Sequence, residues 1–262
     1  MSEIKSQVFN EDCMETMKRI PDASIDLILT DPPYNMTNCD WDNSINLEDL
    51  WSQWERIIKD DGVVIITASQ PFTSHIVLSN IKRFKYELIW EKSNATGHLD
   101  AKKKPMKKHE SILVFNKNGH PKYNVQKEIS KNKNKGRIRS SGNRQSTLYG
   151  SHKKDNTYID DGSRYCTSVL KFQHDSERYN SSKSRIKIHP TQKPVELFRF
   201  LIKSYSNVGD TVFDGFLGGG TTAIACLLEQ RNFIGSELNK DFYLMSMKRI
   251  ENHKSQLKLE LK

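Results

Sequence analysis

The sequence predicts an α/β fold built on one doubly wound, mostly parallel sheet. Short apolar runs, as expected of strands buried on both faces, alternate along the chain with segments of helical apolar spacing. The alternation resumes after a long basic segment in the middle of the chain. Strands and helices that alternate on both sides of an insert are typical of a single sheet with helices on its two faces.

The first half of the chain contains four expected strands, at residues 24–30, 62–67, 86–90 and 111–115. Helical spacing between them predicts helices over residues 46–60 and 71–84. After the basic segment we expect two more strands and three more helices, in the order helix 194–206, strand 210–214, helix 221–231, strand 232–238 and a final helix over about 240–257.

The positive charge of the chain is concentrated in its middle segment. Residues 101–188 contain 22 Lys or Arg against 7 Asp or Glu, a net of +15, and the rest of the chain has 19 against 25, a net of −6. Lys and Arg release counterions when they bind phosphate backbones, so one interpretation is a nucleic-acid-binding module. A solvated or disordered insert is the other. Interleaved aromatic residues indicate that part of the segment packs.

Composition and cysteine placement argue against a membrane protein and a disulfide-stabilised protein. No apolar run approaches the ~20 residues of a membrane-spanning helix, and the N-terminal residues lack the pattern of a signal peptide. The four cysteines, at positions 13, 39, 166 and 226, form no CxxC pair. We therefore expect a cytosolic protein with neither disulfide framework nor bound metal.

A glycine-rich turn follows one expected strand, at the position where ligands bind in such sheets. It reads FDGFLGGGTT, residues 213–222, and its glycines let the backbone approach a ligand while the next helix offers free amides. The following strand ends at Glu237, 17 residues beyond Gly220. An acid near that spacing hydrogen-bonds the ribose of a bound nucleotide. Together, turn and acid indicate an adenosine-containing cofactor.

The composition of this turn favours a cationic cofactor over a dinucleotide. The turn lacks the GxGxxG spacing that covers a pyrophosphate, and Asp214 at its head would repel phosphate. A carboxylate there suits a ligand that carries an ammonium or sulfonium charge. S-adenosylmethionine meets both requirements, because it offers a ribose to Glu237 and a cationic methionyl end to the loop.

A second unusual turn, Asp31-Pro32-Pro33-Tyr34, ends the strand at residues 24–30, and its two prolines make it stiff. One interpretation is an ordinary strand-ending turn with Tyr34 packed beneath it. The other is a site for a planar amine. In that site Tyr34 stacks on the ring, while Asp31 and a neighbouring carbonyl accept hydrogen bonds from the amino group. Those bonds would aim the nitrogen lone pair at an electrophile.

Together these motifs resemble those of the DNA amino-methyltransferases, which act on adenine N6 or cytosine N4. DPPY is similar to the family's catalytic motif, FDGFLGGGTT to its cofactor loop, and HPTQKP (189–194) to the element before that loop. The stretch at 10–35 is similar to the N-terminal block, and WEK (90–92) to a later strand. The matches cover roughly residues 8–116 and 186–250, and their order resembles the permuted β group. The family often has Pro where Gly215 stands and Ser where Gly219 stands.

The resemblance implies roles for the matching residues. The catalytic turn would hold the target amine through Asp31, Pro32, Pro33 and Tyr34, with the Pro32 carbonyl as second acceptor and Asp31 also bordering the cofactor. The cofactor's adenine would be bordered by Asp12 and Cys13, and its ribose would be bound by Glu237. The methionyl pocket would be lined by Asp214, Phe216, Gly218, Gly220 and Thr221, and closed by Thr191, Gln192 and Lys193.

The resemblance also implies the fold of an S-adenosylmethionine-dependent methyltransferase. Residues 1–92 and 186–262 would form the catalytic domain, and residues 93–185 an inserted, basic DNA target-recognition segment. The implied reaction is site-specific methylation of the N6 amine of a flipped-out adenine in double-stranded DNA, with restriction-modification in the cytoplasm of a bacterial or phage-infected cell as its setting. The initial Asp of the motif favours adenine, because cytosine-N4 enzymes more often have Ser there.

Several alternatives stay open at this point. Cytosine-N4 methylation, and nucleic-acid binding without catalysis on the same fold, both fit part of the pattern. Related motifs also serve RNA and protein glutamine substrates, although the basic insert favours nucleic acid. A homodimer is compatible with the sequence.

Overall fold

The computed structural model describes residues 6–34, 46–129, 135–141, 144–146, 150–152, 156–173 and 192–260. The chain forms two compact units. The larger consists of Met1–Asn124 together with Ser168–Lys262, and the smaller of Val125–Thr167. Thr191, a predicted cofactor residue, lies outside the described residues.

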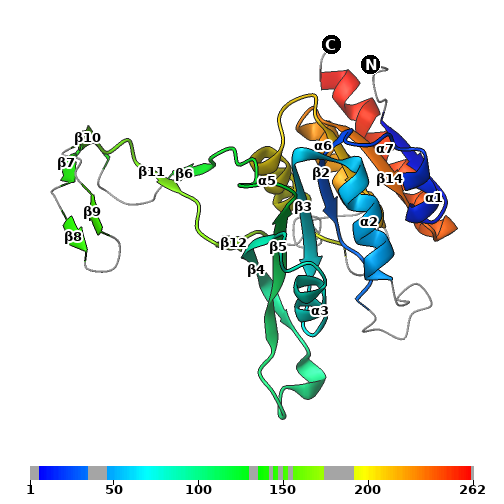
Figure 1. Cartoon of the computed structure of the whole chain (residues 1–262), viewed down its shortest axis with the longest axis horizontal. Helices are drawn as coiled ribbons and strands as arrows, with labels where there is room; N and C mark the ends of the chain where they lie inside the picture. The colour runs from blue at the N-terminus through cyan, green and yellow to red at the C-terminus, as the bar shows by residue number, and fades with distance from the viewer. Residues whose placement is uncertain are drawn as a thin grey trace. The chain divides into compact units, whose positions relative to one another are not determined.

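The larger unit is built on an eight-stranded sheet with the order β1-β14-β13-β2-β3-β5-β4-β12 (Figure 1). Its strands are β1 (Gln7–Phe9), β2 (Ile25–Thr30), β3 (Ile58–Ala68), β4 (Phe84–Thr96), β5 (Lys107–Asn116), β12 (Val169–Lys171), β13 (Thr211–Asp214) and β14 (Asn232–Ser236). Neighbouring strands are parallel except at β5, which runs antiparallel to both β3 and β4. The sheet is therefore mostly parallel, as the sequence predicts.

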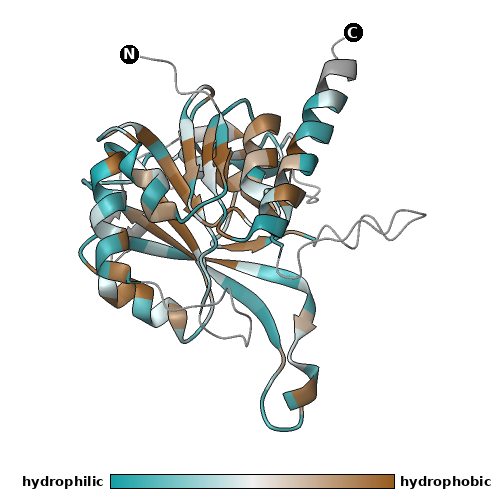
Figure 2. Cartoon of the chain, turned by 90° about the vertical axis from the view of Figure 1, so that its right-hand side faces the viewer, coloured by the Kyte–Doolittle hydropathy of each residue, from teal (hydrophilic) through white to brown (hydrophobic). Residues whose placement is uncertain are grey.

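Helices cover both faces of this sheet. They are α1 (Cys13–Lys18), α2 (Leu47–Ile57), α3 (Phe72–Ser79), α5 (Val195–Tyr205), α6 (Thr221–Leu228) and α7 (Lys240–Glu260). Successive side chains of β2 point to opposite faces. Leu27 and Leu29 accordingly pack in one buried cluster with residues of α5, α6 and α7. Ile28 packs in a second cluster with residues of α1, α2 and α3. The two clusters confirm the doubly wound arrangement, and Figure 2 shows hydrophobic segments in brown on strands of the sheet and on helices that cover it.

Several element boundaries differ from the predicted ones for local reasons. Helix α2 ends at Ile57 because Ile58 is already extended and pairs with Ile25, so β3 follows without a loop. Helix α6 ends at Leu228, and Gln230 beyond it has a φ of 59°. The strands expected at 86–90 and 111–115 are longer, because their polar ends pair with each other beyond the buried part of the sheet. The short elements β1 and α1 were not predicted.

The smaller unit contains three two-stranded antiparallel sheets. Their pairings are β7 (Ile138–Ser141) with β10 (Asn156–Ile159), β6 (Lys127–Ile129) with β11 (Ser163–Tyr165), and β8 (Arg144–Ser146) with β9 (Gly150–His152). The buried Asp160 receives two hydrogen bonds, of 2.7 and 2.8 Å, from the Arg164 guanidinium. This unit spans fewer residues than the insert expected over residues 93–185. Residues 93–116 belong instead to the strands and hairpin of the larger sheet.

Candidate active site

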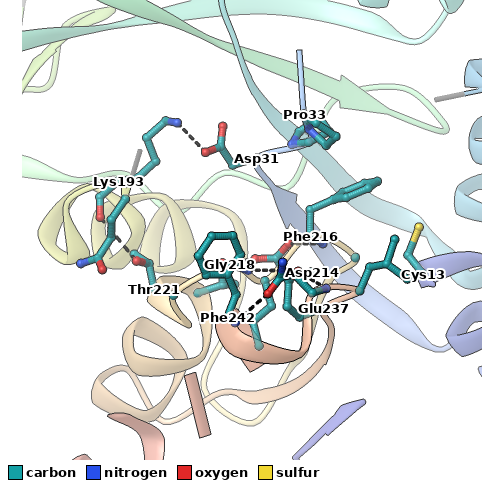
Figure 3. A pocket seen from close by; sticks show the side chains of 18 of the residues that line it. Cys13, Asp31, Pro33, Lys193, Asp214, Phe216, Gly218, Thr221, Glu237 and Phe242 are labelled. Carbon is teal, nitrogen blue, oxygen red and sulfur yellow. Dashed lines mark hydrogen bonds and ion pairs between the residues drawn. The ribbon is translucent and has the colours of Figure 1, made fainter. Parts of the chain in front are cut away.

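A cavity of about 350 Å³ lies where four parallel strands end (Figure 3). Its walls are formed by the residues that directly follow β1, β2, β13 and β14. We call this side of the sheet the carboxyl edge, and it is where ligands bind in doubly wound folds. The volume is within the range of sites for small organic molecules.

Most of the predicted site residues line this one cavity. They are Asp12, Cys13, Asp31, Pro32, Pro33, Tyr34, Gln192, Lys193, Asp214, Phe216, Gly218, Thr221 and Glu237. Gly220 is not among the lining residues. Its φ is 79°, and a Cβ on it would lie 3.1 Å from the Cβ of Ser246. Glycine is therefore needed here for the turn into α6, whatever the contact with a ligand.

The Asp31 carboxylate is held by donors from three elements. Its Oδ1 accepts hydrogen bonds from the Tyr34 hydroxyl at 2.5 Å and from the Thr67 hydroxyl at the end of β3. Its Oδ2 accepts one from Lys193 Nζ at 2.5 Å. The side chain keeps 24% of its surface exposed. It is thus fixed in direction while one side remains open to the cavity.

Lys193 belongs to a chain of alternating charges that begins at Asp31. Its Nζ also lies 3.4 Å from Glu110 Oε2, and Lys92 Nζ lies 2.7 Å from Glu110 Oε1. Burial alone would lower the pKa of Lys193, but attraction by Asp31, Tyr34 and Glu110 outweighs it and holds this pKa well above its usual value. Burial raises the pKa of Glu110, but the positive charges of Lys193 and Lys92 lower it by more. The pKa of Glu110 therefore lies below its usual value. Lys193 and Glu110 are therefore charged together, as buried ions require partners.

Tyr34 is partly buried and fixed at both ends of its side chain. The ring stacks on Phe72, with centroids 5.3 Å apart and planes 26° apart. Burial, and then the nearby Asp31 charge, raise the pKa of the Tyr34 hydroxyl well above its usual value. The phenol therefore stays protonated and acts as a donor to Asp31. This geometry offers a carboxylate and a fixed aromatic ring side by side.

The Asp214 carboxylate accepts hydrogen bonds from groups of the protein itself. Its Oδ1 accepts hydrogen bonds from the Thr30 hydroxyl (2.7 Å) and the Phe216 amide (3.0 Å), and its Oδ2 accepts one from the Thr222 hydroxyl. Burial raises the pKa of Asp214 to about 6. These bonds fix the glycine-rich turn between β13 and α6. A direct contact of Asp214 with a methionyl cation stays a prediction.

Glu237 is arranged to accept further hydrogen bonds at the cavity wall. Its Oε2 accepts one from the Gly218 amide and its Oε1 one from the Asn239 amide, both at 2.8 Å. A carboxylate has about four acceptor positions, so about two remain for a ligand with hydroxyl donors. A ribose diol fits this donor requirement. Burial raises the pKa of Glu237.

Asp12 and Cys13 stand at the start of α1. The Asp12 carboxylate caps this helix by accepting a 2.7 Å hydrogen bond from the Met14 amide. Cys13 is 7% exposed, and burial together with the Asp12 charge raises the pKa of its thiol to about 12. The thiol is therefore protonated at neutral pH, so it packs in the wall and is no nucleophile.

Two groups of site residues were missed by the sequence reasoning. The first group supports Asp31: Thr67 bonds to it directly, and Glu110 acts through Lys193. The second group, Thr30 and Thr222, bonds to Asp214. Further wall residues are Glu11, Phe198, Leu217, Leu238, Asn239 and Phe242. One available signal was the position of Thr30 and Thr67, which lie at the ends of buried strands at the carboxyl edge. Another was Asn239, whose Oδ1 accepts from the amides of Asp241 and Phe242 as a helix cap does.

The described part of the chain contains neither a cluster of metal-binding side chains nor a helix that could span a membrane. Within it, no three His, Cys, Asp or Glu side chains are grouped so that they could hold a metal ion. No described helix combines the length and the apolar character needed to cross a membrane.

Comparison with known proteins relates this chain to DNA methyltransferases. The model of a DNA methylase family (N6_N4_Mtase) matches residues 25–248. The type II methyltransferase M1.MboII of Moraxella bovis is 25% identical over 248 residues, which cover 90% of this chain and 93% of the relative. The DNA adenine methyltransferase YhdJ of Escherichia coli K12 is 28% identical over 256 residues, covering 93% of this chain and 82% of the relative.

Solved structures confirm the fold. The crystal structure of the M1.HpyAVI–SAM complex aligns with a TM-score of 0.60 at 25% identity, covering 93% of this chain and 98% of the other. The cytosine-N4-specific PvuII DNA methyltransferase aligns with a TM-score of 0.62, covering 97% and 92%. At 15% identity the second alignment bears on the fold alone.

Proposed function

The chain belongs to the DNA methylase family of N6 and N4 methyltransferases, and from that premise we propose that it methylates the N6 amine of adenine in double-stranded DNA. S-adenosylmethionine is its cofactor, and DNA its substrate. The observation that carries the proposal is the Asp31 carboxylate, held open to the cavity beside Tyr34. We assign target recognition to the basic segment at residues 93–185.

The cavity residues fit S-adenosylmethionine. Glu237 keeps acceptor positions for the ribose hydroxyls beside the Gly218 amide, and Asp12 and Cys13 form the wall at the start of α1. Phe216 and Thr221 line the part of the cavity formed by the glycine-rich turn. When bound, the cofactor supplies a methyl group carried on a positively charged sulfur.

Asp31 then has two tasks toward the target amine. Its Oδ1 already accepts two hydrogen bonds, but from the residues that the structure describes its Oδ2 accepts only the one from Lys193. Oδ2 therefore has a free acceptor position for an N6 hydrogen, and the Pro32 carbonyl would take the other. These bonds orient the nitrogen lone pair. As the N–CH3 bond forms, the S–CH3 bond would break and leave a neutral thioether, so the positive charge passes to the nitrogen. The fixed Asp31 charge would stabilise it until an N6 proton leaves to solvent.

Adenine is favoured over cytosine by two observations. The motif begins with Asp at position 31, and a relative that covers most of this chain is a DNA adenine methyltransferase. A labelling experiment decides the matter. The protein is incubated with S-adenosylmethionine labelled in its methyl group and DNA of mixed sequence, and the DNA is digested to nucleosides. We expect the label in N6-methyladenine. Label in N4-methylcytosine would contradict the base assignment, and unlabelled DNA would contradict the activity.

A further inference from the structure

We propose that the hairpin between β4 and β5, residues 93–109, is an arm that grips the DNA backbone beside the target base. This inference rests on the proposed function and deepens it. It assigns to the larger unit a phosphate-binding surface of its own, separate from the compact unit at Val125–Thr167. We call residues 93–109 the basic hairpin.

The sheet topology places the basic hairpin at the carboxyl edge. β4 and β3 are both antiparallel to β5, so they run in the same direction, and β4 ends at the edge where β3 ends. β5 starts from that same edge. Beyond the sheet the pairing is irregular: it shifts register between Glu91 and Thr96 and ends with Thr96 opposite Lys107, where the Thr96 hydroxyl donates to the Lys107 carbonyl at 3.3 Å. Figure 1 shows this extension projecting from the sheet.

The root of the basic hairpin is joined to the reaction site by charge. Lys92 and Glu110 flank it directly and form an ion pair of 2.7 Å. Glu110 contacts Lys193, and Lys193 contacts Asp31 at 2.5 Å. A duplex that presents a base to Asp31 therefore has its flanking phosphates near this root. With a rise of ~3.3 Å per residue, the hairpin can follow the duplex for up to ~20 Å, or about six base pairs.

The hairpin is dominated by positive charge, although it also exposes the apolar side chains of Leu99 and Met106. Five of the seven residues from 102 to 108 are lysines, and the whole hairpin contains a single acid, Asp100. Lys102 and Lys103 are exposed, and Lys104, 3.6 Å from Asp100, keeps 69% of its side-chain surface exposed. Figure 2 draws the paired strands of the hairpin mainly in hydrophilic colours. A two-stranded hairpin without an apolar face contributes little to folding.

An ordinary solvated turn would not gather like charges so closely. The excess of positive charge extends to the root. Burial lowers the pKa of Lys107, and repulsion from Lys92 and Lys193 adds to this against the attraction of Glu110. Adjacent cations repel each other in the free protein, and a phosphate backbone would remove that repulsion while releasing counterions. The hairpin therefore fits a polyanion as its partner.

The test compares two triple variants that lose the same charge. The first, K102Q/K103Q/K104Q, neutralises the hairpin. The second, K82Q/K248Q/K254Q, neutralises three exposed lysines elsewhere, one between α3 and the start of β4 and two on α7. DNA affinity is measured by fluorescence anisotropy on a labelled duplex of about 30 base pairs, between about 50 and 200 mM salt. S-adenosylhomocysteine is present to prevent turnover.

We expect the hairpin variant to bind DNA at least about ten-fold more weakly than the wild-type protein at about 100 mM salt. Its log–log salt slope should fall by about 2–3, since each lost phosphate contact removes about 0.9. The control variant should change both values little. Equal affinities and slopes for the two variants would overturn the assignment. As a second measurement, benzophenone attached to A101C should crosslink to the duplex, and a failure to exceed the crosslinking of the unsubstituted protein would also overturn it.

The failure of this inference is distinguishable from that of the proposed function. Methyl transfer by the wild-type protein tests the function. If the wild-type protein labels DNA while the hairpin variant binds like its control, the function stands and the arm does not. If the wild-type protein labels no DNA and its binding is insensitive to salt, both fail. Calorimetric titration of the hairpin variant with S-adenosylmethionine should give the wild-type affinity, which shows that the cavity is intact.

Discussion

The Nζ atom of Lys193 lies 2.5 Å from Oδ2 of Asp31, inside the site and only 6% exposed. The sequence comparison had suggested that Lys193 closes the cofactor pocket near the cofactor carboxylate. In the structure it is the counter-ion of the Asp31 carboxylate, and it links Asp31 to Glu110. The two roles predict different behaviour for a variant without the lysine charge.

Lys193→Met should destabilise the protein by about 2–4 kcal/mol at neutral pH, because it leaves Asp31 and Glu110 without the cation between them. Its kcat should fall strongly, since Asp31 loses its fixed direction. Urea unfolding measures the first effect and single-turnover kinetics the second. The double variant K193M/E110Q, which removes one of the two stranded charges, should recover much of the stability. A stable Lys193→Met protein with weakened S-adenosylmethionine affinity would instead support contact with the cofactor.

Asp31→Asn should lose at least about a hundred-fold in kcat, because the amide cannot stabilise the positive nitrogen as the carboxylate does. Affinity for S-adenosylmethionine should change by only a few fold, since Asp31 touches the amine and only borders the cofactor. Measuring kcat and titrating the same sample with S-adenosylmethionine in a calorimeter separates the loss of turnover from any loss of cofactor affinity. A variant that keeps a substantial fraction of the wild-type kcat would remove Asp31 from the catalytic role.

How far the sequence predicts this site depends on how local each contact is. The turn at Asp31 and the glycine-rich turn at Asp214 are continuous stretches, and their positions after apolar runs predicted the cavity between them. The distant partners of Asp31 come from β3 and from the segment before α5, and Glu110 of β5 pairs in turn with Lys193. Only the folded sheet brings these together, so Thr67 and Glu110 could not be identified from spacing.

The strands of the sheet also divide into features that the local sequence predicts and features that only the folded sheet determines. Apolar runs predicted the buried parts of β4 and β5, but not their direction or length. An apolar run gives no signal for an antiparallel β5, because the residue pattern of a strand buried on both faces is the same in either direction. The paired ends that form the basic hairpin have no apolar pattern at all. They were therefore read as part of a basic insert.

Glu237→Ala should weaken S-adenosylmethionine binding by about 1.5–3 kcal/mol, the scale of a hydrogen bond to a charged group. The variant also frees the Gly218 amide that Glu237 now holds. Isothermal titration calorimetry measures the change. Glu251→Ala, at an exposed acid on α7 that does not line the cavity, is the matched control and should bind as wild type. Unchanged affinity in Glu237→Ala would show that the ribose is held elsewhere.

Asp214 should make the stability of the protein depend on pH. Burial raises its pKa from 3.8 to about 6, so the folded protein binds this proton more tightly than the unfolded chain. The resulting stability is fully present below about pH 3.8 and is lost as the pH rises through about 6. Asp214→Asn cannot titrate. The unfolding free energy of wild type relative to Asp214→Asn should therefore fall by about 2–3 kcal/mol over that window. Urea unfolding at several pH values measures the difference, and a constant difference would contradict the prediction.

Tyr34 should receive the target base once it has left the duplex. An adenine amine inside the helix cannot reach a cavity at the edge of a sheet, so the base must flip out at a cost of a few kcal/mol. The Tyr34 ring is already fixed by Phe72 and by its bond to Asp31. It can therefore return about 1–3 kcal/mol by stacking, and the basic hairpin supplies backbone contacts.

The measurement replaces the target adenine with 2-aminopurine, once the methylated position has been located. Binding of the wild-type protein should raise the fluorescence, because the probe leaves the base stack. Tyr34→Phe keeps the ring and should keep most of this signal, but with a lower kcat, because Asp31 loses a donor. Tyr34→Ala should change the signal and weaken binding by about ten-fold, at the low end of the stacking energy. With the probe moved two positions along the strand, the rise should disappear. A probe that stays quenched in a saturated wild-type complex would mean that the base is not flipped.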